Sequence, residues 1–139
     1  MDTIDTRDLI ADRNDYKQAI LYSFLDEFSQ YEEMTDSFED IRFEEEELES
    51  WKEDWSDELN AIREINELEE GICNGEFDFG IALIAEDDFE HFVVQDLEDC
   101  GYIPENFPTW IEIDWERTAN NVKMDYSEVE FRGTTYLYR

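Results

Sequence analysis

The chain has 139 residues, of which 41 are Asp or Glu and 10 are Lys or Arg, so its formal net charge at pH 7 is -31. This length is that of one domain, or of a small domain with a helical extension. The charge excludes nucleic-acid binding through a basic patch, because the phosphate backbone would be repelled. Such a charge is also typical of disordered chains, but 10 Phe, 7 Tyr and 4 Trp residues favour a packed core. We therefore expect a folded protein with a strongly anionic surface.

A first helix is predicted for residues 5–31, where apolar side chains recur mostly every fourth residue, as on one helix face. Asp5 or Thr6 is expected to cap its start, and residues 32–43 form a connector. The apolar face consists of Leu9, Tyr16, Ile20, Phe24, Phe28 and Tyr31.

A second helix is predicted for residues 43–70, because apolar side chains fall on the a and d positions of a heptad. This seam is expected to pack on the first helix or on a partner chain, and for Trp51 and Trp55 we favour packing in the core. The seam consists of Leu48, Trp51, Trp55, Ile62, Ile65 and Ile72, with Leu59 and Leu68 beside it and Glu58 and Glu69 in its two remaining positions.

Shorter elements follow in the second half of the chain. We predict a helix break with a turn at residues 73–80 and a buried strand at 79–85. A helix at 86–103 is expected to be capped by Asp87 or Asp88 and ended by Gly101, and a short strand is expected at 109–113. A helix at 114–126 capped by Asp114 and a β-hairpin at 127–139 that turns at Arg132-Gly133 complete the chain. The predicted fold is α+β. Residues 1–75 form a long antiparallel helical hairpin, and residues 76–139 form a small αβ domain that ends in the β-hairpin.

Acidic residues are dense and largely unpaired along the second helix. From Glu44 to Glu70 there are thirteen acidic residues and two basic ones, and no Lys or Arg lies between Glu64 and Glu116. A 27-residue helix spans ~40 Å, and one strand of B-DNA carries ~12 charges over that length. The similar density predicts a DNA mimic that occupies the basic DNA-binding groove of another protein.

The carboxylates expected to meet that partner lie on the second helix and on the helix at 86–103. They are Glu45, Glu46, Glu49, Glu53, Asp54, Asp57, Glu64, Glu67, Glu70, Asp87, Asp88, Asp96 and Asp99. Four alternatives account for some of the same features: a solubilising surface, adaptation to high salt, an adaptor that binds a partner helix through the Trp51–Ile72 seam, and a buffer of divalent cations.

The sequence carries no motif of an enzyme. His91 is the single histidine, and no phosphate-binding loop, nucleophile elbow or calcium loop is present. We therefore expect no catalytic activity, no cofactor and no bound metal. Cys73 and Cys100 form no CxxC pair, and neither a signal peptide nor a stretch of ~20 apolar residues occurs. These features predict a cytoplasmic protein with reduced thiols.

Two stretches in the second half carry a family resemblance: "GIALIAEDDFEHF" and "DLEDCGYIPENFPTWIEIDWERTANNVKMDYSEVEFRGTTYLYR". Residues 79–139 resemble the C-terminal part of the ArdA-type antirestriction proteins. The whole chain, with its opening "IDTRDL", is also similar to small acidic phage and prophage proteins that are often labelled antirestriction proteins. The resemblance implies a DNA mimic from a mobile element that blocks type I restriction–modification enzymes, often as an elongated homodimer. ArdA proteins have three small domains, whereas here the helices of residues 5–72 stand in place of the first two.

Overall fold

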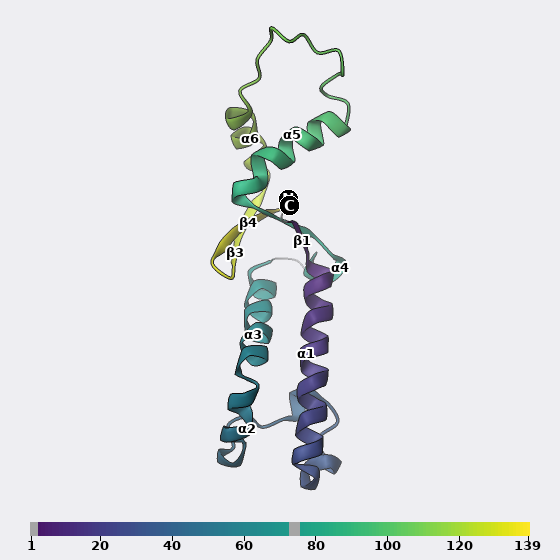
Figure 1. The fold of residues 1–139 in the computed structure, drawn as a ribbon, viewed down its shortest axis with the longest axis vertical. Coiled ribbons are helices and arrows are strands. Elements are labelled where there is room, and N and C mark those ends of the chain that lie inside the picture. The colour runs from purple at the N-terminus through teal and green to yellow at the C-terminus, as the bar shows by residue number, and fades with distance from the viewer. Residues whose placement is uncertain (1–2, 73–75) are drawn as a thin grey trace.

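The molecule is elongated and combines helices with one antiparallel sheet, as the α+β prediction requires (Figure 1). The computed structural model describes residues 3–72 and 76–139. A helical hairpin forms one end, a four-stranded sheet lies in the middle, and two further helices joined by a long loop form the other end (Figure 1).

The first helix, α1 (Thr6–Glu27), confirms the predicted element and is shorter at its C-terminus than predicted. Asp5 caps it, because its carboxylate accepts a hydrogen bond from the backbone N–H of Arg7 at 2.9 Å. The backbone leaves the helical region at Phe28, and two 3-10 helices follow, η1 (Ser29–Met34) and η2 (Phe38–Asp40).

The second helix was predicted as one continuous element, and that prediction is wrong in two places. It consists of η3 (Glu46–Leu48), α2 (Glu49–Asp54) and α3 (Ser56–Gly71), with a break at Trp55. The chain folds back before α2, where Phe43 stacks on Trp51 with ring centroids 6.1 Å apart and its carbonyl accepts a hydrogen bond from Lys52 Nζ at 3.1 Å. These tertiary contacts override the local helical pattern at the start.

The sheet contains β1 (Thr3–Asp5), β2 (Ala82–Ala85), β3 (Ser127–Phe131) and β4 (Thr134–Tyr138), in the antiparallel order β1-β2-β4-β3. The hairpin turn at Arg132-Gly133 is confirmed, since the two residues have φ values of 51° and 79°, as a two-residue type I′ turn requires. The sequence did not indicate β1. The strand predicted at 79–85 begins only at Ala82, after the short helix α4 (Glu76–Phe79) and Gly80 at φ 86°.

The two faces of the sheet bury different cores, because side chains alternate along a strand. Leu83 and Tyr138 belong to the core that the sheet shares with the base of the helical hairpin. Ile84 and Leu137, each one residue away, belong to the core beneath the terminal helices. The sheet thus lies between the two ends of the molecule.

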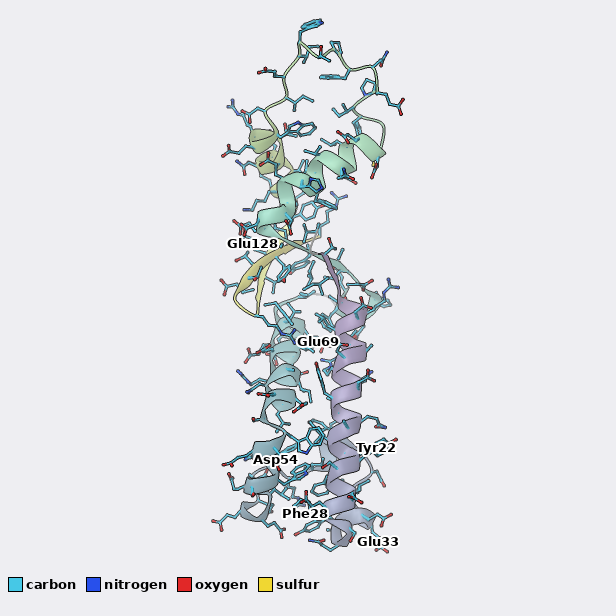
Figure 2. The ribbon with its side chains drawn as sticks, viewed as in Figure 1. Tyr22, Phe28, Glu33, Asp54, Glu69 and Glu128 are labelled. Atoms are coloured by element: carbon cyan, nitrogen blue, oxygen red, sulfur yellow. The ribbon has the colours of Figure 1, made fainter. Side chains whose placement is uncertain are left out.

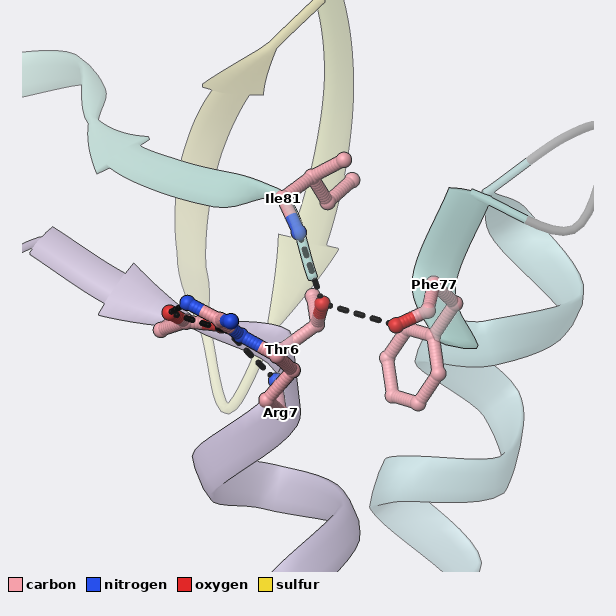
Figure 3. Close-up of polar contacts among 5 residues, drawn as sticks. Thr6, Arg7, Phe77 and Ile81 are labelled. Atoms are coloured by element: carbon pink, nitrogen blue, oxygen red, sulfur yellow. Dashed lines mark hydrogen bonds and ion pairs between the residues drawn. The ribbon is translucent and has the colours of Figure 1, made fainter. Parts of the chain in front are cut away.

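The predicted boundary between residues 75 and 76 crosses a shared core. Leu9 and Ile65 of the hairpin pack in one cluster with Phe77 and Leu83. The buried hydroxyl of Thr6 joins the same parts, since it donates to the Phe77 carbonyl at 2.9 Å and accepts from the Ile81 N–H at 2.9 Å (Figure 3). The predicted turn at Asn74-Gly75 lies outside the described residues.

The far end contains η4 (Glu86–Asp88), α5 (Phe89–Asp99) and α6 (Trp115–Lys123). Gly101 ends α5 as predicted: it has φ 80°, and the Tyr102 N–H bonds the Leu97 carbonyl at 3.0 Å, the pattern of a Schellman motif. Asp114 caps α6 through the Arg117 N–H at 3.1 Å.

The strand predicted at residues 109–113 is wrong, because this stretch lies in the loop between α5 and α6. A strand needs a free sheet edge to pair with. The edge beside β2 is occupied instead by β1, and Trp110 of the loop is 81% exposed.

Candidate partner-binding surface

The apolar seam of the second helix is closed within the chain. Ile62, Ile65 and Leu68 are buried, and α3 lies beside α1 over its length (Figure 1). Leu48 and Trp51 of the seam pack with Ile20, Leu21 and Phe24 of α1 in one cluster. The hairpin is therefore a packed unit whose apolar seam is not open to a partner.

Aromatic packing fixes the end of the hairpin that lies farthest from the sheet. Phe24 contacts Phe28, Tyr31 and Trp51 with ring centroids 5.3 to 6.1 Å apart. The Trp51 indole meets Phe28 edge-on, with an interplanar angle of 85°. Such pairs contribute ~0.5–1.5 kcal/mol each beyond the area that they bury, so this end is a packed support for surface charges.

The predicted partner-binding carboxylates are distributed over both halves of the molecule. Eleven of the thirteen are exposed, whereas Glu64 and Asp88 are half-buried. Those on α2 and α3 are exposed except Glu64, and Asp54 lies in the half of the hairpin that is farther from the sheet (Figure 2). Asp87, Asp96 and Asp99 belong to the far end, beyond the sheet. The structure therefore does not unite the thirteen residues in a single patch.

Few carboxylates are paired. Ion pairs within residues 3–72 and 76–139 use eight carboxylates, of the 41 in the chain. Three of them are predicted contact residues: Glu49 with Lys52 at 3.4 Å, Glu67 with Arg63 at 3.3 Å, and Glu64 with Arg132 at 2.7 Å. The last pair ties α3 to the β3–β4 turn, so Glu64 has a structural role.

The acidic row is shorter than predicted and is interrupted. Because α2 and α3 together hold 22 helical residues, they extend over ~33 Å, a length over which one DNA strand carries ~10 charges. Nine acidic residues lie between Glu49 and Glu70, so the linear density still resembles that of a strand. None of the nine falls between Glu58 and Glu64, and the row therefore has a gap of about one and a half helical turns.

A second acidic row lies on α1 and was missed. Its exposed members are Asp8, Asp12 and Asp15 in the first half of α1 and Asp26 and Glu27 at its end, with no acidic residue between Asp15 and Asp26. Three basic residues, Arg7, Arg13 and Lys17, lie on the same helix. The sequence contained the signal, since these residues alternate with the buried positions of the same helix, but only the antiparallel packing of α1 on α3 places two rows on one body. Two packed helices are ~20–24 Å wide, close to the width of a duplex.

Two ionisable groups at the hairpin tip are perturbed by their partners. The hydrogen bond from Lys17 Nζ, 2.8 Å long, lowers the pKa of Glu39 below its ordinary value. The Tyr31 hydroxyl donates a hydrogen bond to the Glu47 carboxylate, and this hydrogen bond raises the pKa of the phenol. Tyr31 therefore stays neutral and holds the Glu47 carboxylate in place.

Comparison with protein families, curated proteins and solved structures gave no match. Within the described residues no helix is long and apolar enough to cross a membrane. The same residues contain no group of three or more His, Cys, Asp or Glu side chains arranged to hold a metal ion. Cys100 is exposed and free, and Cys73 lies outside the described residues.

Proposed function

We propose that this protein is a DNA mimic that inhibits a DNA-binding host-defence enzyme by occupying its DNA-binding groove. The proposed target class is the type I restriction–modification enzymes, in agreement with the resemblance of residues 79–139 to the ArdA-type proteins. The protein acts stoichiometrically and in the cytoplasm of the host, and it carries no catalytic centre of its own.

One observation carries the proposal: exposed, mostly unpaired carboxylates lie along α2 and α3 and toward both ends of α1, in a hairpin whose apolar seam is already closed. A surface that served the fold alone would gain from i,i+4 ion pairs. Here the self-repulsion of the charges destabilises the compact state. Presentation of a fixed negative field to a basic partner explains why such a surface is kept.

Recognition by such a surface follows from simple electrostatics. Lys and Arg side chains of a DNA-binding groove contact phosphates without reading sequence, and fixed carboxylates at a similar spacing satisfy the same side chains. The rigid hairpin spends little conformational entropy on binding. One mimic therefore suits enzymes that recognise different DNA sequences.

The adaptor alternative has less support from the structure. It requires the Trp51–Ile72 seam to be open to a partner helix. Trp51 is 4% exposed and Ile65 is 0% exposed, both packed against residues of this chain. Binding there would require the hairpin to open.

The test is inhibition of DNA cleavage by a purified type I restriction enzyme. We expect inhibition to saturate at a fixed molar ratio, to weaken with rising salt and to be relieved by excess duplex DNA. Inhibition that duplex DNA does not relieve would show that the groove is not the site and would overturn the proposal.

A charge-reversal variant locates the surface. It replaces six exposed hairpin carboxylates by Lys: Glu45, Glu46, Glu53, Asp54, Asp57 and Glu70. The matched control reverses six exposed carboxylates of the far end: Glu90, Glu98, Glu105, Glu112, Glu116 and Asp125. We expect the first variant to lose inhibition and the control to retain most of it. A folded hairpin variant that inhibits as well as the parent would exclude the hairpin as the mimic.

A further inference from the structure

The tip of the helical hairpin contains an open cavity of about 640 Å³, formed where the end of α1 meets residues 31–48. Its floor includes Phe24, Tyr31 and Leu48. Phe24 and Leu48 are almost fully buried, and the Phe24 and Tyr31 rings stack at 6.1 Å. The cavity thus has a buried apolar base, and the half-buried Tyr31 ring is the aromatic surface that it offers.

The rim of this tip cavity is anionic. Five carboxylates and one guanidinium line it, which leaves it strongly negative. Glu44 and Glu45 are exposed and make no side-chain hydrogen bond or ion pair within the described residues. Glu47 is held by the Tyr31 hydroxyl, while Arg42 supplies the one positive charge. Unpaired carboxylates above an aromatic floor are suited to a cation with an apolar stem.

The neighbouring surface shows the same chemistry completed by the chain itself. Lys17 Nζ lies 5.4 Å from the centroid of the Phe38 ring and 2.8 Å from a carboxylate oxygen of Glu39. Glu39 also lines the tip cavity. At the neighbouring site the Phe38 ring and the Glu39 carboxylate bind the ammonium group of Lys17. The tip cavity has an aromatic ring and carboxylates as well, and these can bind a cation from another molecule.

We propose that the tip cavity receives an arginine side chain of the basic protein partner. The guanidinium is planar, stacks on aromatic faces and pairs with carboxylates through two parallel hydrogen bonds, and these are the groups that floor and rim provide. This inference rests on the proposed function, since it names the side chain of the basic partner that the hairpin tip binds. It adds one defined anchor to a surface that otherwise acts through distributed charge.

The probe is N-acetyl-arginine amide, titrated into the isotopically labelled full chain and followed by amide chemical shifts. Shift changes are expected at Tyr31, Met34, Arg42 and Leu48, which line the cavity. N-acetyl-citrulline amide, which has nearly the same shape and no charge, is expected to cause none. Shift changes spread evenly over the acidic surface, or equal changes with citrulline, would overturn the inference.

A pair of charge-matched variants tests the site. Glu44→Gln/Glu45→Gln removes two rim charges without loss of a hydrogen bond, and Glu90→Gln/Glu98→Gln removes two exposed charges from α5 at the far end. We expect the first variant to weaken binding of the arginine probe at least fivefold and the second by less than twofold. Equal weakening would mean that only net charge matters. If the first variant does not fold, Glu47→Gln provides a second rim variant.

The outcomes separate this inference from the proposed function, because the probe titration uses no enzyme. Diffuse arginine binding with intact inhibition of the restriction enzyme would overturn the proposed arginine site in the tip cavity, and the proposed DNA-mimic function would stand. Localised arginine binding without inhibition of any DNA-binding enzyme would support the proposed arginine site in the tip cavity and overturn the proposed DNA-mimic function.

Discussion

The indole Nε1 of Trp51 donates a hydrogen bond to the Ser23 hydroxyl oxygen at 2.9 Å, and this contact joins the two helices of the hairpin. Trp55 donates to the same oxygen at 3.2 Å. A hydroxyl oxygen has two acceptor lone pairs, so one serine of α1 satisfies both Trp51 of α2 and Trp55, the residue at the junction between α2 and α3. The contact explains how a polar residue fits among the aromatic side chains of the tip.

Ser23→Ala is expected to lower the free energy of unfolding by ~1–3 kcal/mol, because the buried Trp51 N–H loses its acceptor. Urea denaturation followed by tryptophan fluorescence measures the loss. Ser50→Ala, an exposed change on α2, is the control and should alter stability by less than ~0.5 kcal/mol. Equal effects of the two changes would show that the indole contacts contribute nothing to stability.

The helical hairpin was predictable because its evidence is periodic. Ile62, Ile65 and Leu68 repeat at helical spacing, and all three are buried. β1 was not predictable, since three residues at the start of the chain carry no pattern and become a strand only by pairing with β2, almost eighty residues later. Residues 109–113 show the converse, since they alternate like a strand but pair with no strand of the sheet.

The Thr6 hydroxyl provides a second test of how the hairpin is attached to the sheet. Thr6→Val keeps the shape of the side chain but leaves the Ile81 N–H without its acceptor, and the Phe77 carbonyl keeps only the longer bond from the Gly80 N–H at 3.4 Å (Figure 3). We expect a loss of ~2–4 kcal/mol. Thr6→Ser, the control, keeps the hydroxyl and loses one methyl group, at a cost of ~1 kcal/mol. A Val variant as stable as the Ser variant in chemical denaturation would contradict the assignment.

Gly80 tests the same junction through the backbone. It has φ 86°, and an added Cβ would clash with the side chain of Arg7. Gly101 has φ 80° and open space at the same position. Both Ala variants should therefore incur a strain of ~1–3 kcal/mol, and Gly80→Ala should be the more destabilising because the Arg7 side chain must also move.

The steric part of the Gly80 effect can be isolated with a double-mutant cycle. In an Arg7→Ala background the excess cost of Gly80→Ala over Gly101→Ala should largely disappear. The exposed ion pair between Arg7 and Asp5 is lost in that background, but such pairs contribute little to stability. If Gly80→Ala still destabilises the protein more than Gly101→Ala in the Arg7→Ala background, the extra loss of stability does not come from a clash with the Arg7 side chain.

The candidate binding surface was less predictable than the hairpin, because it depends on how distant segments of the chain pack together. The acidic density of residues 44–70 is visible in the sequence. The second acidic row on α1, and the tip cavity where Phe24 meets Glu45 and Glu47, exist only because segments more than twenty residues apart pack together. Composition alone therefore identifies the sign of the charge and predicts a basic partner, while packing determines where the charge is concentrated.

The thermal midpoint of the chain is expected to rise by several degrees between low salt and ~0.15 M NaCl, where charges farther apart than ~8 Å are screened. The physical reason is the self-repulsion of a chain with a net charge of -31. Calorimetry at constant pH measures the shift. A variant with Glu45, Glu46, Glu53, Asp54, Asp57 and Glu70 replaced by the corresponding amides is the control, and its midpoint should be higher in low salt and rise less with salt. A flat or falling midpoint in the parent chain would mean that the close ion pairs, and not the unpaired carboxylates, dominate its electrostatics.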